Sequence, residues 1–290
     1  MSDAIRKIGV FALSNAPDAG LLEKGCANLA DFLHAEVVCD CQTTPDPRKM
    51  AGDDCSRARR FNDLLADDSI DMLVAARGGY GVTRILDKID VAALRRSGKW
   101  LCGYSDVSAL LLYAWKNGCT RLIHGPMICS GWANIRESKE CLREAELFRK
   151  LLEDVSDGNG TMRLESTMTL KRGCATAPLI PTNLTMLNSL VGTTFLPELS
   201  GTIIALEDVN EPAHSIDRKL NQLRQCGILG ALKGLVFGHF TDADDGSYIP
   251  EILNEYAACI DGPVIIDYPL GHDHPSTPLV FGRNCTLEAN

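Results

Sequence analysis

Residues 71–81 read DMLVAARGGYG, a pattern that indicates the class of the first domain. After its first residue, the apolar run without helical spacing is typical of a buried strand. The glycines of the segment 77–81 predict a tight turn where that strand ends. Residues 99–108, KWLCGYSDVS, repeat the arrangement, because an apolar strand again runs into a polar turn. Since helix-like segments follow both turns, these strands are expected to run parallel.

Strand-like and helix-like segments alternate through the whole first half of the chain. This alternation predicts a parallel sheet with helices on both faces, in a flavodoxin-like α/β domain. The expected strands are 8–13, 36–39, 71–76 and 99–103, and the expected helices are 19–34, 53–66, one that starts within 82–86, and 107–117.

The pattern changes near residue 150, where short strand-like segments take over. Gly158-Asn159-Gly160 is a turn signal, and the domain boundary is placed within 154–160. We therefore expect a domain over 1–154 and a smaller, β-rich domain over 161–290. In the second domain the expected strands are 162–164, 168–170, 202–206, 235–237 and 264–266, and the expected helices are 183–191 and 215–226.

The composition narrows the class of protein. The chain has 290 residues, of which 45% are hydrophobic and 23% charged, so it can bury a sizeable core and is not disordered. With 29 Lys and Arg against 38 Asp and Glu, its net charge is −9, which argues against nucleic acid as a partner. No apolar run approaches the ~20 residues of a membrane span. With no signal-peptide core either, a cytoplasmic location and twelve reduced cysteines are expected.

Two turns could carry chemistry. Ser105 stands between a strand and a helix, the position of a nucleophile elbow, although a helix cap is the alternative and GxSxG is absent. The 77–81 loop suits an oxyanion hole or a phosphate cradle, with a plain tight turn as the alternative. Arg84 stands where a GxGxxG pattern that begins at Gly79 needs its last glycine. The sequence therefore gives only weak support for a dinucleotide-binding fold.

Carboxylates and histidines cluster later in the chain. Glu207, Asp208 and Glu211 follow an apolar run, where they could orient a histidine or simply be a solvated strand end. Glu207 and Asp208 should face opposite sides of a strand. His272 follows a glycine in a loop and could act as a general base. Possible metal ligands are Cys39 and Cys41, His272 and His274, and Asp242, Asp244 and Asp245; their patterns are incomplete, and neither metal nor cofactor is expected.

The joint order of five motifs resembles one family. Residues 76–86 are similar to its ARGGYGxxRLL segment, 103–110 to GxSDxTAL and 124–127 to HGPM. Residues 206–218 resemble LEDVxEPxYxIDR, and 269–282 resemble PxGHxxxxxxLPLG. The family is the LD-carboxypeptidases, serine peptidases that include muramoyl-tetrapeptide carboxypeptidase.

The resemblance implies a catalytic triad of Ser105 as nucleophile, His272 as base and Glu207 as the carboxylate that orients the imidazole. Backbone N–H groups near Gly79 and Asp106 would form the oxyanion hole. The site is expected at the domain interface. The free carboxylate of the substrate needs a donor, which Arg77, Arg84 or the backbone N–H groups of the 77–81 loop could supply.

The function implied is removal of the terminal D-alanine from murein tetrapeptide during bacterial cell-wall recycling, by a cytoplasmic homodimer. Two alternatives stay open: a peptidase of the microcin C self-immunity type, which cleaves peptidyl- or aminoacyl-nucleotides, and a ligand-binding protein without turnover. Three positions depart from the family pattern and could touch the substrate pocket: Leu13 before Ser14 in place of proline, Leu111 in place of histidine, and His214 in place of an aromatic residue.

Overall fold

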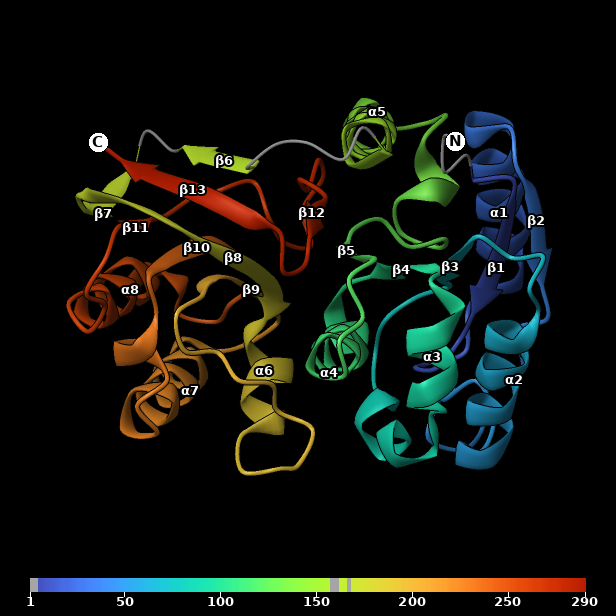
Figure 1. Ribbon diagram of the computed structural model, residues 1–290, viewed down its shortest axis with the longest axis horizontal. Coiled ribbons are helices and arrows are strands. Elements are labelled where there is room, and N and C mark those ends of the chain that lie inside the picture. Colours follow the sequence, from blue (N-terminus) through green and yellow to red (C-terminus); the bar gives the residue numbers. More distant parts are fainter. Residues whose placement is uncertain (1–4, 157–161, 166–167) are drawn as a thin grey trace. The chain divides into compact units, whose positions relative to one another are not determined.

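The computed structural model describes residues 5–156, 162–165 and 168–290. The chain forms two compact units (Figure 1). The first unit comprises Met1–Asn159 and Thr277–Leu279, and the second comprises Gly160–Ser276 and Val280–Asn290. The turn expected at residues 158–160 lies outside the described residues.

The first unit is built on a six-stranded sheet in the order β12-β5-β4-β3-β1-β2. Strands β1 to β5 pair in parallel, which confirms the predicted fold class. Every residue of the central strands β3 and β4 is buried, because helices cover both faces of a parallel sheet. The strands are β1 (Lys7–Phe11), β2 (Glu36–Cys39), β3 (Met72–Ala75), β4 (Trp100–Gly103), β5 (Leu122–His124) and β12 (Leu279–Val280).

Helices flank this sheet on both sides. In Figure 1, α1 and α5 lie on one face, and α2, α3 and α4 lie on the other. Asp18 caps α1 by accepting from the N–H of Leu21, and Asp53 caps α2 in the same way. The helices are α1 (Ala19–Leu33), α2 (Asp54–Ala66), α3 (Val91–Ser97), α4 (Ser108–Lys116) and α5 (Lys139–Ser156).

The helix expected to start within 82–86 is wrong. Two short 3-10 turns, Val82–Arg84 and Leu86–Lys88, occupy this segment, and α3 begins only at Val91. The apolar residues of the segment do point inward, which explains the helical spacing. The N–H groups of Arg84 and Ile85, however, bond to the carbonyls three residues back, which gives 3-10 turns, while the N–H of Val82 donates to the side chain of Asp106.

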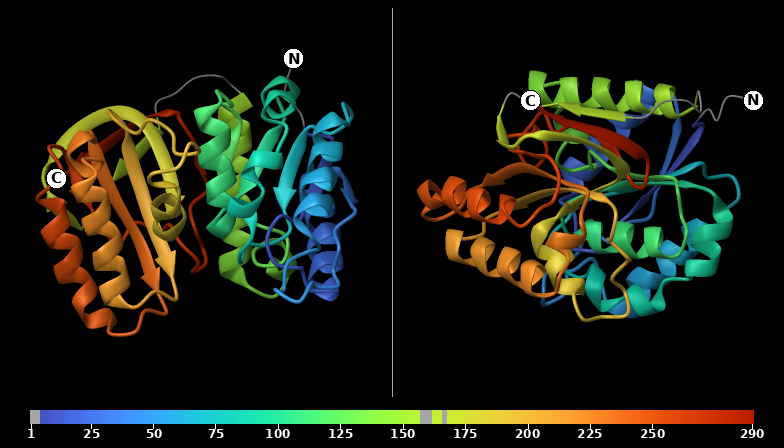
Figure 2. Two further views of the ribbon diagram at one scale, coloured as in Figure 1. Left: turned by 90° about the horizontal axis from the view of Figure 1, so that it is seen from below. Right: turned by 60° about the vertical axis from the view of Figure 1, so that its left-hand side comes forward.

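The second unit contains a seven-stranded sheet in the order β6-β13-β8-β9-β10-β11-β7. Its central strands, β8 to β11, pair in parallel, while β13 and β7 run antiparallel to their neighbours β8 and β11. Helices α7 and α8 lie side by side against it (Figure 2). The elements are β6 (Met162–Glu165), β7 (Thr169–Lys171), β8 (Gly173–Asn183), α6 (Leu184–Leu190), β9 (Ile203–Val209), α7 (Ala213–Gln225), β10 (Gly234–Thr241), α8 (Ile249–Ala257), β11 (Val264–Ile265) and β13 (Asn284–Ala289).

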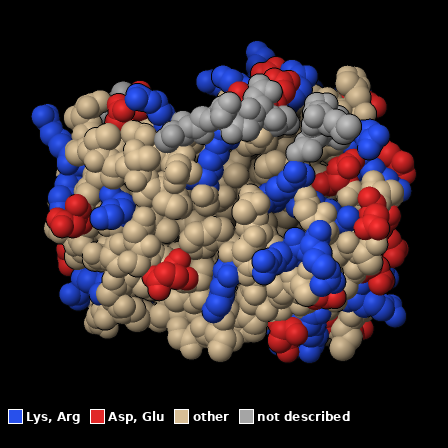
Figure 3. All heavy atoms as spheres, in the orientation of Figure 1, with Lys and Arg blue, Asp and Glu red and all other residues tan. Residues whose placement is uncertain are grey.

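Charged side chains of both signs are interspersed on the face shown in Figure 3. None of the helices in the described part of the chain is long and apolar enough to cross a bilayer.

A buried arginine joins α2 to two loops of the first unit. Arg57 is only 1% exposed, and its guanidinium donates to the carbonyl oxygens of Leu13 and Gly81. The same guanidinium pairs with Asp54 at 2.6 Å. Arg57 therefore holds together the segments that follow β1 and β3.

We predict that Arg57→Leu lowers the free energy of unfolding by about 3 kcal/mol, because two buried carbonyls lose their donor and Asp54 loses one of its two arginine partners. Arg59→Leu is the matched control: Arg59 lies on the same helix but is exposed. Its effect should stay within about 0.5 kcal/mol. Urea unfolding of the full chain measures both, and equal effects in the two variants would contradict the structural role of Arg57.

Candidate active site

Ser105 lies at the turn between β4 and α4 in a conformation that favours glycine. Its φ is 59°, a left-handed value that costs a non-glycine residue roughly 1–2 kcal/mol. The glycine loop approaches it closely, since a Cβ at Gly78 would lie 2.8 Å from both Cβ and Oγ of Ser105. A strained serine whose side chain faces a glycine backbone is the geometry of a nucleophile elbow.

The side chain of Asp106 ties this turn to two other loops. Asp106 is 1% exposed, and its Oδ2 accepts from Oγ of Ser14 at 2.6 Å and from the N–H of Val82 at 3.0 Å. Within the described residues, Oδ1 has no hydrogen-bond partner. Burial raises the pKa of Asp106, and the two hydrogen bonds offset part of that rise. The loops after β1, β3 and β4 therefore meet at one carboxylate.

The glycine loop presents a backbone donor. The N–H of Gly79 makes no hydrogen bond to any residue that the structure describes. Its neighbour Tyr80 is held through its own N–H, which donates to Oδ1 of Asn15 at 3.3 Å. A vacant N–H in the loop that adjoins Ser105 can stabilise a developing oxyanion.

The two arginines predicted to bind substrate differ in their surroundings. Arg84 makes two bonds to Asp54, at 3.1 and 2.7 Å, and is committed to that carboxylate. Arg77 donates from Nε to the carbonyl oxygen of Gly78 at 3.2 Å, and no carboxylate of the described residues pairs with it. Arg77 is therefore the better candidate for binding an external anion.

In the second unit, the buried Glu207 pairs with the half-buried His272. Oε2 of Glu207 lies 2.7 Å from Nδ1 of His272, and Glu207 has no solvent exposure. Burial raises the pKa of Glu207, whereas the hydrogen bond to His272 acts in the opposite direction. When Glu207 is ionised it can only accept, and in that state Nδ1 of His272 carries the proton and Nε2 is the ring nitrogen that can accept one.

An asparagine that the sequence analysis assigned no role holds the carboxylates at the end of β9. Nδ2 of Asn183 lies 3.2 Å from Oε1 of Glu207 and 2.9 Å from Oδ1 of Asp208. Asp208 also accepts from the N–H and hydroxyl of Thr185, at 3.0 and 2.7 Å. Asp208 thus anchors the start of α6, while Glu207 contacts the histidine. The signal available in the sequence was an asparagine directly before an apolar helix, a typical cap.

The rival carboxylate, Glu211, and a second histidine of the same unit, His239, have other partners. Glu211 pairs with Lys219 at 2.5 Å and accepts from Ser215. Burial alone would raise the pKa of Glu211, but the bonds to Lys219 and Ser215 together outweigh it and leave that pKa lowered. Nε2 of His239 lies 3.4 Å from Oδ1 of Asp267, and both residues line a hollow of ≈ 680 Å³, but 63% of that aspartate side chain is exposed. Exposed pairs are screened by water, unlike the pair of Glu207.

The remaining candidates are placed as follows. In the part of the chain that the structure describes, no three His, Cys, Asp or Glu side chains are arranged to hold a metal ion. Leu111 is fully buried in α4, and His214 is exposed at the start of α7. The hydroxyl of Ser14 donates to Asp106, although Leu13 precedes it in place of the family's proline.

Both parts of the chain match models of one family. Residues 8–125 match the LD-carboxypeptidase N-terminal domain, and residues 176–287 match the LD-carboxypeptidase C-terminal domain. A murein tetrapeptide carboxypeptidase of Pseudomonas aeruginosa is 30% identical over 84% of this chain and 80% of its own length. A probable murein peptide carboxypeptidase of Bacillus subtilis is 26% identical over 97% of this chain and 88% of its own.

Solved structures agree on the fold. The muramoyltetrapeptide carboxypeptidase of Oxalobacter formigenes superposes with a TM-score of 0.84 at 26% identity, covering 98% of this chain and 95% of that one. The microcin C7 self immunity protein MccF reaches a TM-score of 0.81 at 21% identity, covering 98% and 96% of the two chains, and shares the fold. By its sequence matches to both domains and to curated relatives, this chain belongs to the LD-carboxypeptidase family.

Proposed function

We propose that this chain is a serine carboxypeptidase that removes the terminal D-alanine from murein tetrapeptide. The observation that carries the proposal is the pair of His272 with the fully buried Glu207 at 2.7 Å. Such a pair fixes the tautomer of an imidazole base and stabilises the imidazolium that forms during catalysis. The relatives named as murein peptide carboxypeptidases support the substrate class.

Each residue has a distinct role in the proposed reaction. Nε2 of His272 takes the proton of the Ser105 hydroxyl as Oγ attacks the carbonyl carbon before D-alanine. The N–H groups of Gly79 and Asp106 stabilise the oxyanion. His272 then returns the proton to the leaving amine. In the second half of the reaction His272 takes a proton from water, the water oxygen attacks the acyl carbon, and the proton passes back to Oγ of Ser105. The mechanism requires Ser105 and His272 to act on one bond.

The free carboxylate of the terminal D-alanine needs a cationic partner. Arg77 directly precedes Gly78, whose backbone adjoins Ser105. A carboxylate bound to Arg77 therefore belongs to the residue next to the bond that is cleaved, which selects for release of one residue.

The cytoplasmic location, the homodimer and the division into domains over 1–154 and 161–290 stay predictions.

The decisive assay offers murein tetrapeptide and a pentapeptide ending in D-Ala-D-Ala. We expect free D-alanine and tripeptide from the tetrapeptide, with little turnover of the pentapeptide, as measured by mass spectrometry. The extra residue moves the terminal carboxylate away from Arg77. Equal rates on both peptides would contradict the assignment. Release of nucleotide from an aminoacyl-nucleotide instead would favour the self-immunity type, and binding without any turnover would favour a ligand-binding protein.

Ser105→Ala should remain folded and lose on the order of 10⁶ in kcat, because the nucleophile is removed. Ser108→Ala is the matched control, since its buried hydroxyl starts the same helix and has no hydrogen-bond partner among the described residues. It should keep kcat within a few-fold. Labelling by a fluorophosphonate should fail in Ser105→Ala and in His272→Ala. Near-normal turnover by Ser105→Ala would show that Ser105 is not the nucleophile and would leave it the role of a helix cap.

Glu207→Gln should lose about 10⁴ in kcat with the fold retained, because an amide can hold the wrong imidazole tautomer and supplies no counter-charge. Glu211→Gln tests the neighbouring carboxylate, whose partner is Lys219, and should be milder. Steady-state kinetics and circular dichroism of both variants provide the comparison. The assignment fails if Glu211→Gln is the more damaged in kcat while both proteins are equally folded.

A further inference from the structure

A hollow of ≈ 680 Å³ lies at the carboxyl end of β10 in the second unit, and we call it the β10 hollow. Its wall is formed by Met168, residues 238–243, Gly246, the start of α8, residues 266–267 and Asp273. Glu207 stands at the same edge of the sheet, because it lies near the end of β9, which pairs in parallel with β10. In open α/β sheets, ligands bind outside the carboxyl ends of the strands. The volume also lies in the range of about 300–1,000 Å³ that ligand pockets occupy.

The backbone of β10 joins this hollow to the loop that carries His272. The pairing between β9 and β10 shifts in register between residues 237 and 240. Within this irregular stretch, the N–H of His239 donates to the carbonyl oxygen of Leu270 at 2.7 Å. A Cβ at Gly271 would lie 3.2 Å from the Cβ of His239. The wall of the β10 hollow is therefore packed directly against the two residues that precede His272, as is typical of β-bulges near active sites.

The charges on the wall of the β10 hollow are unbalanced. Three carboxylates line it, from Asp242, Asp267 and Asp273, and among its described lining residues there is no Lys or Arg. Nε2 of His239 lies 3.4 Å from Oδ1 of Asp267, and Nδ1 lies 3.7 Å from Oδ2 of Asp273. Both distances are longer than a good hydrogen bond, and in the described part of the chain no group donates a hydrogen bond to these three carboxylates. Even a protonated His239 therefore leaves the wall with a net negative charge.

The rest of the wall is largely apolar. Ile249 and Leu253 of α8 line it, together with Ile266 after β11. Met168 also lines it and is 46% exposed, so that its flexible side chain is accessible to a ligand. Such a wall suits a ligand with an aliphatic stem and a cationic end, because the stem can cover apolar surface while the charge stays beside the carboxylates.

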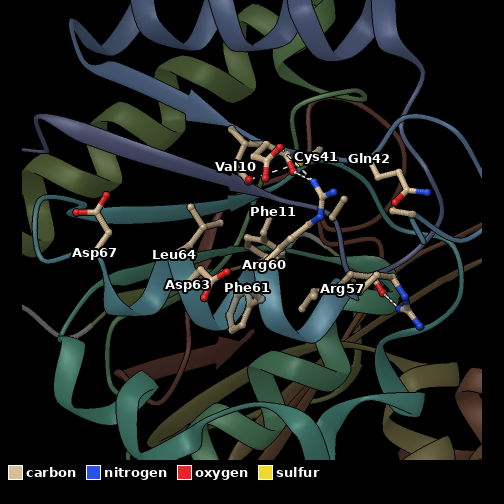
Figure 4. Close-up of a pocket in the computed structure, with 14 residues that line it drawn as sticks. Val10, Phe11, Cys41, Gln42, Arg57, Arg60, Phe61, Asp63, Leu64 and Asp67 are labelled. Atoms are coloured by element: carbon tan, nitrogen blue, oxygen red, sulfur yellow. Dashed lines mark hydrogen bonds and ion pairs between the residues drawn. The ribbon is translucent and has the colours of Figure 1, made fainter. Parts of the chain in front are cut away.

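The hollow between β1 and α2 in the first unit offers a contrast (Figure 4). It measures ≈ 230 Å³, which is below the usual range of ligand pockets. Its two arginines already have partners, since Arg60 lies 3.2 Å from Oδ1 of Asp40 and Arg57 donates to the carbonyl oxygen of Leu13. The cationic groups of that wall are thus paired within the protein, and the β10 hollow is the better candidate for binding a charged group.

We propose that the β10 hollow binds the side chain of the residue before D-alanine, and that this side chain ends in an ammonium group. This subsite rests on the proposed function, because it takes His272 as the base that acts on the bond after this residue. The aliphatic stem lies along Met168 and Leu253, and the ammonium lies between the carboxylates of Asp267 and Asp273. The enzyme therefore prefers a peptide with lysine or another diamino acid at this position over one with a neutral side chain of the same length.

Calorimetry with Ser105→Ala tests the hollow without turnover. Two tetrapeptides are compared that differ only in the residue before D-alanine, which is lysine in one and norleucine in the other. The lysine peptide should bind on the order of tenfold more tightly at low ionic strength, because partly exposed ion pairs each contribute modestly. Added salt should reduce this ratio by screening the carboxylates. Equal affinities at low ionic strength would overturn the proposal.

Two further variants locate the ammonium. Asp267→Asn and Asp273→Asn, each placed in the Ser105→Ala background, should weaken binding of the lysine peptide about threefold and leave the norleucine peptide unchanged. Asp261→Asn is the matched control, because Asp261 is exposed in the same unit but does not line the hollow. It should change neither affinity. Unchanged lysine binding in both variants, or an equal loss for both peptides, would overturn the proposal.

Release of D-alanine by the unaltered chain separates this subsite from the proposed function. Both peptides should release it, with kcat/KM on the order of tenfold higher for the lysine peptide. Equal values would overturn the subsite and leave the carboxypeptidase standing. Tighter binding of the lysine peptide without any release would overturn the carboxypeptidase and leave the ammonium site standing. Failure of both peptides to bind would overturn both.

Discussion

Burying a carboxylate at the carboxyl end of a parallel strand is the constraint on which both units depend. Asp106 follows β4 with 1% exposure, and Glu207 and Asp208 end β9 with 0% and 3%. A carboxylate without water costs several kcal/mol unless donors replace the hydration. The donors here come from neighbouring loops and from the start of a helix. Satisfying each carboxylate therefore also fixes the backbone around it.

The two units meet this constraint in different ways. Asp106 recruits one hydroxyl and one backbone N–H, and so orders loops from three strands. Asn183 serves two carboxylates with one amide nitrogen, while its oxygen accepts from the N–H of Met186 at the start of α6. Because Asp208 takes the α6 contacts, Glu207 is left to face His272. The different roles of Glu207 and Asp208 therefore follow from the hydrogen-bond donors that each carboxylate can reach.

Much of the first sheet could be predicted from its sequence, because buried parallel strands such as 71–76 are continuous apolar runs. The segment 82–86 was wrongly predicted to start a helix. Its inward-facing residues have helical spacing, but the side chain of Asp106 binds its backbone. Strand β8 was missed because Pro178 and Pro181 argue against a central strand. Motif order pointed to Glu207 and His272. No spacing rule could show that Asn183, two dozen residues earlier, contacts both carboxylates, because that contact exists only once β8 and β9 pair in register.

The strand β12 has a consequence for how the protein is made. Residues 277–279 belong with the first unit, and β12 occupies the edge of its sheet beside β5 (Figure 1). A ribosome builds the chain from its N-terminus, so β5 emerges about 150 residues before the strand that covers it. Until then the nascent sheet presents an open edge, the kind of surface on which other strands can add. The first unit is thus completed only after most of the second unit has been synthesised, and any premature stop before residue 277 leaves its sheet one strand short.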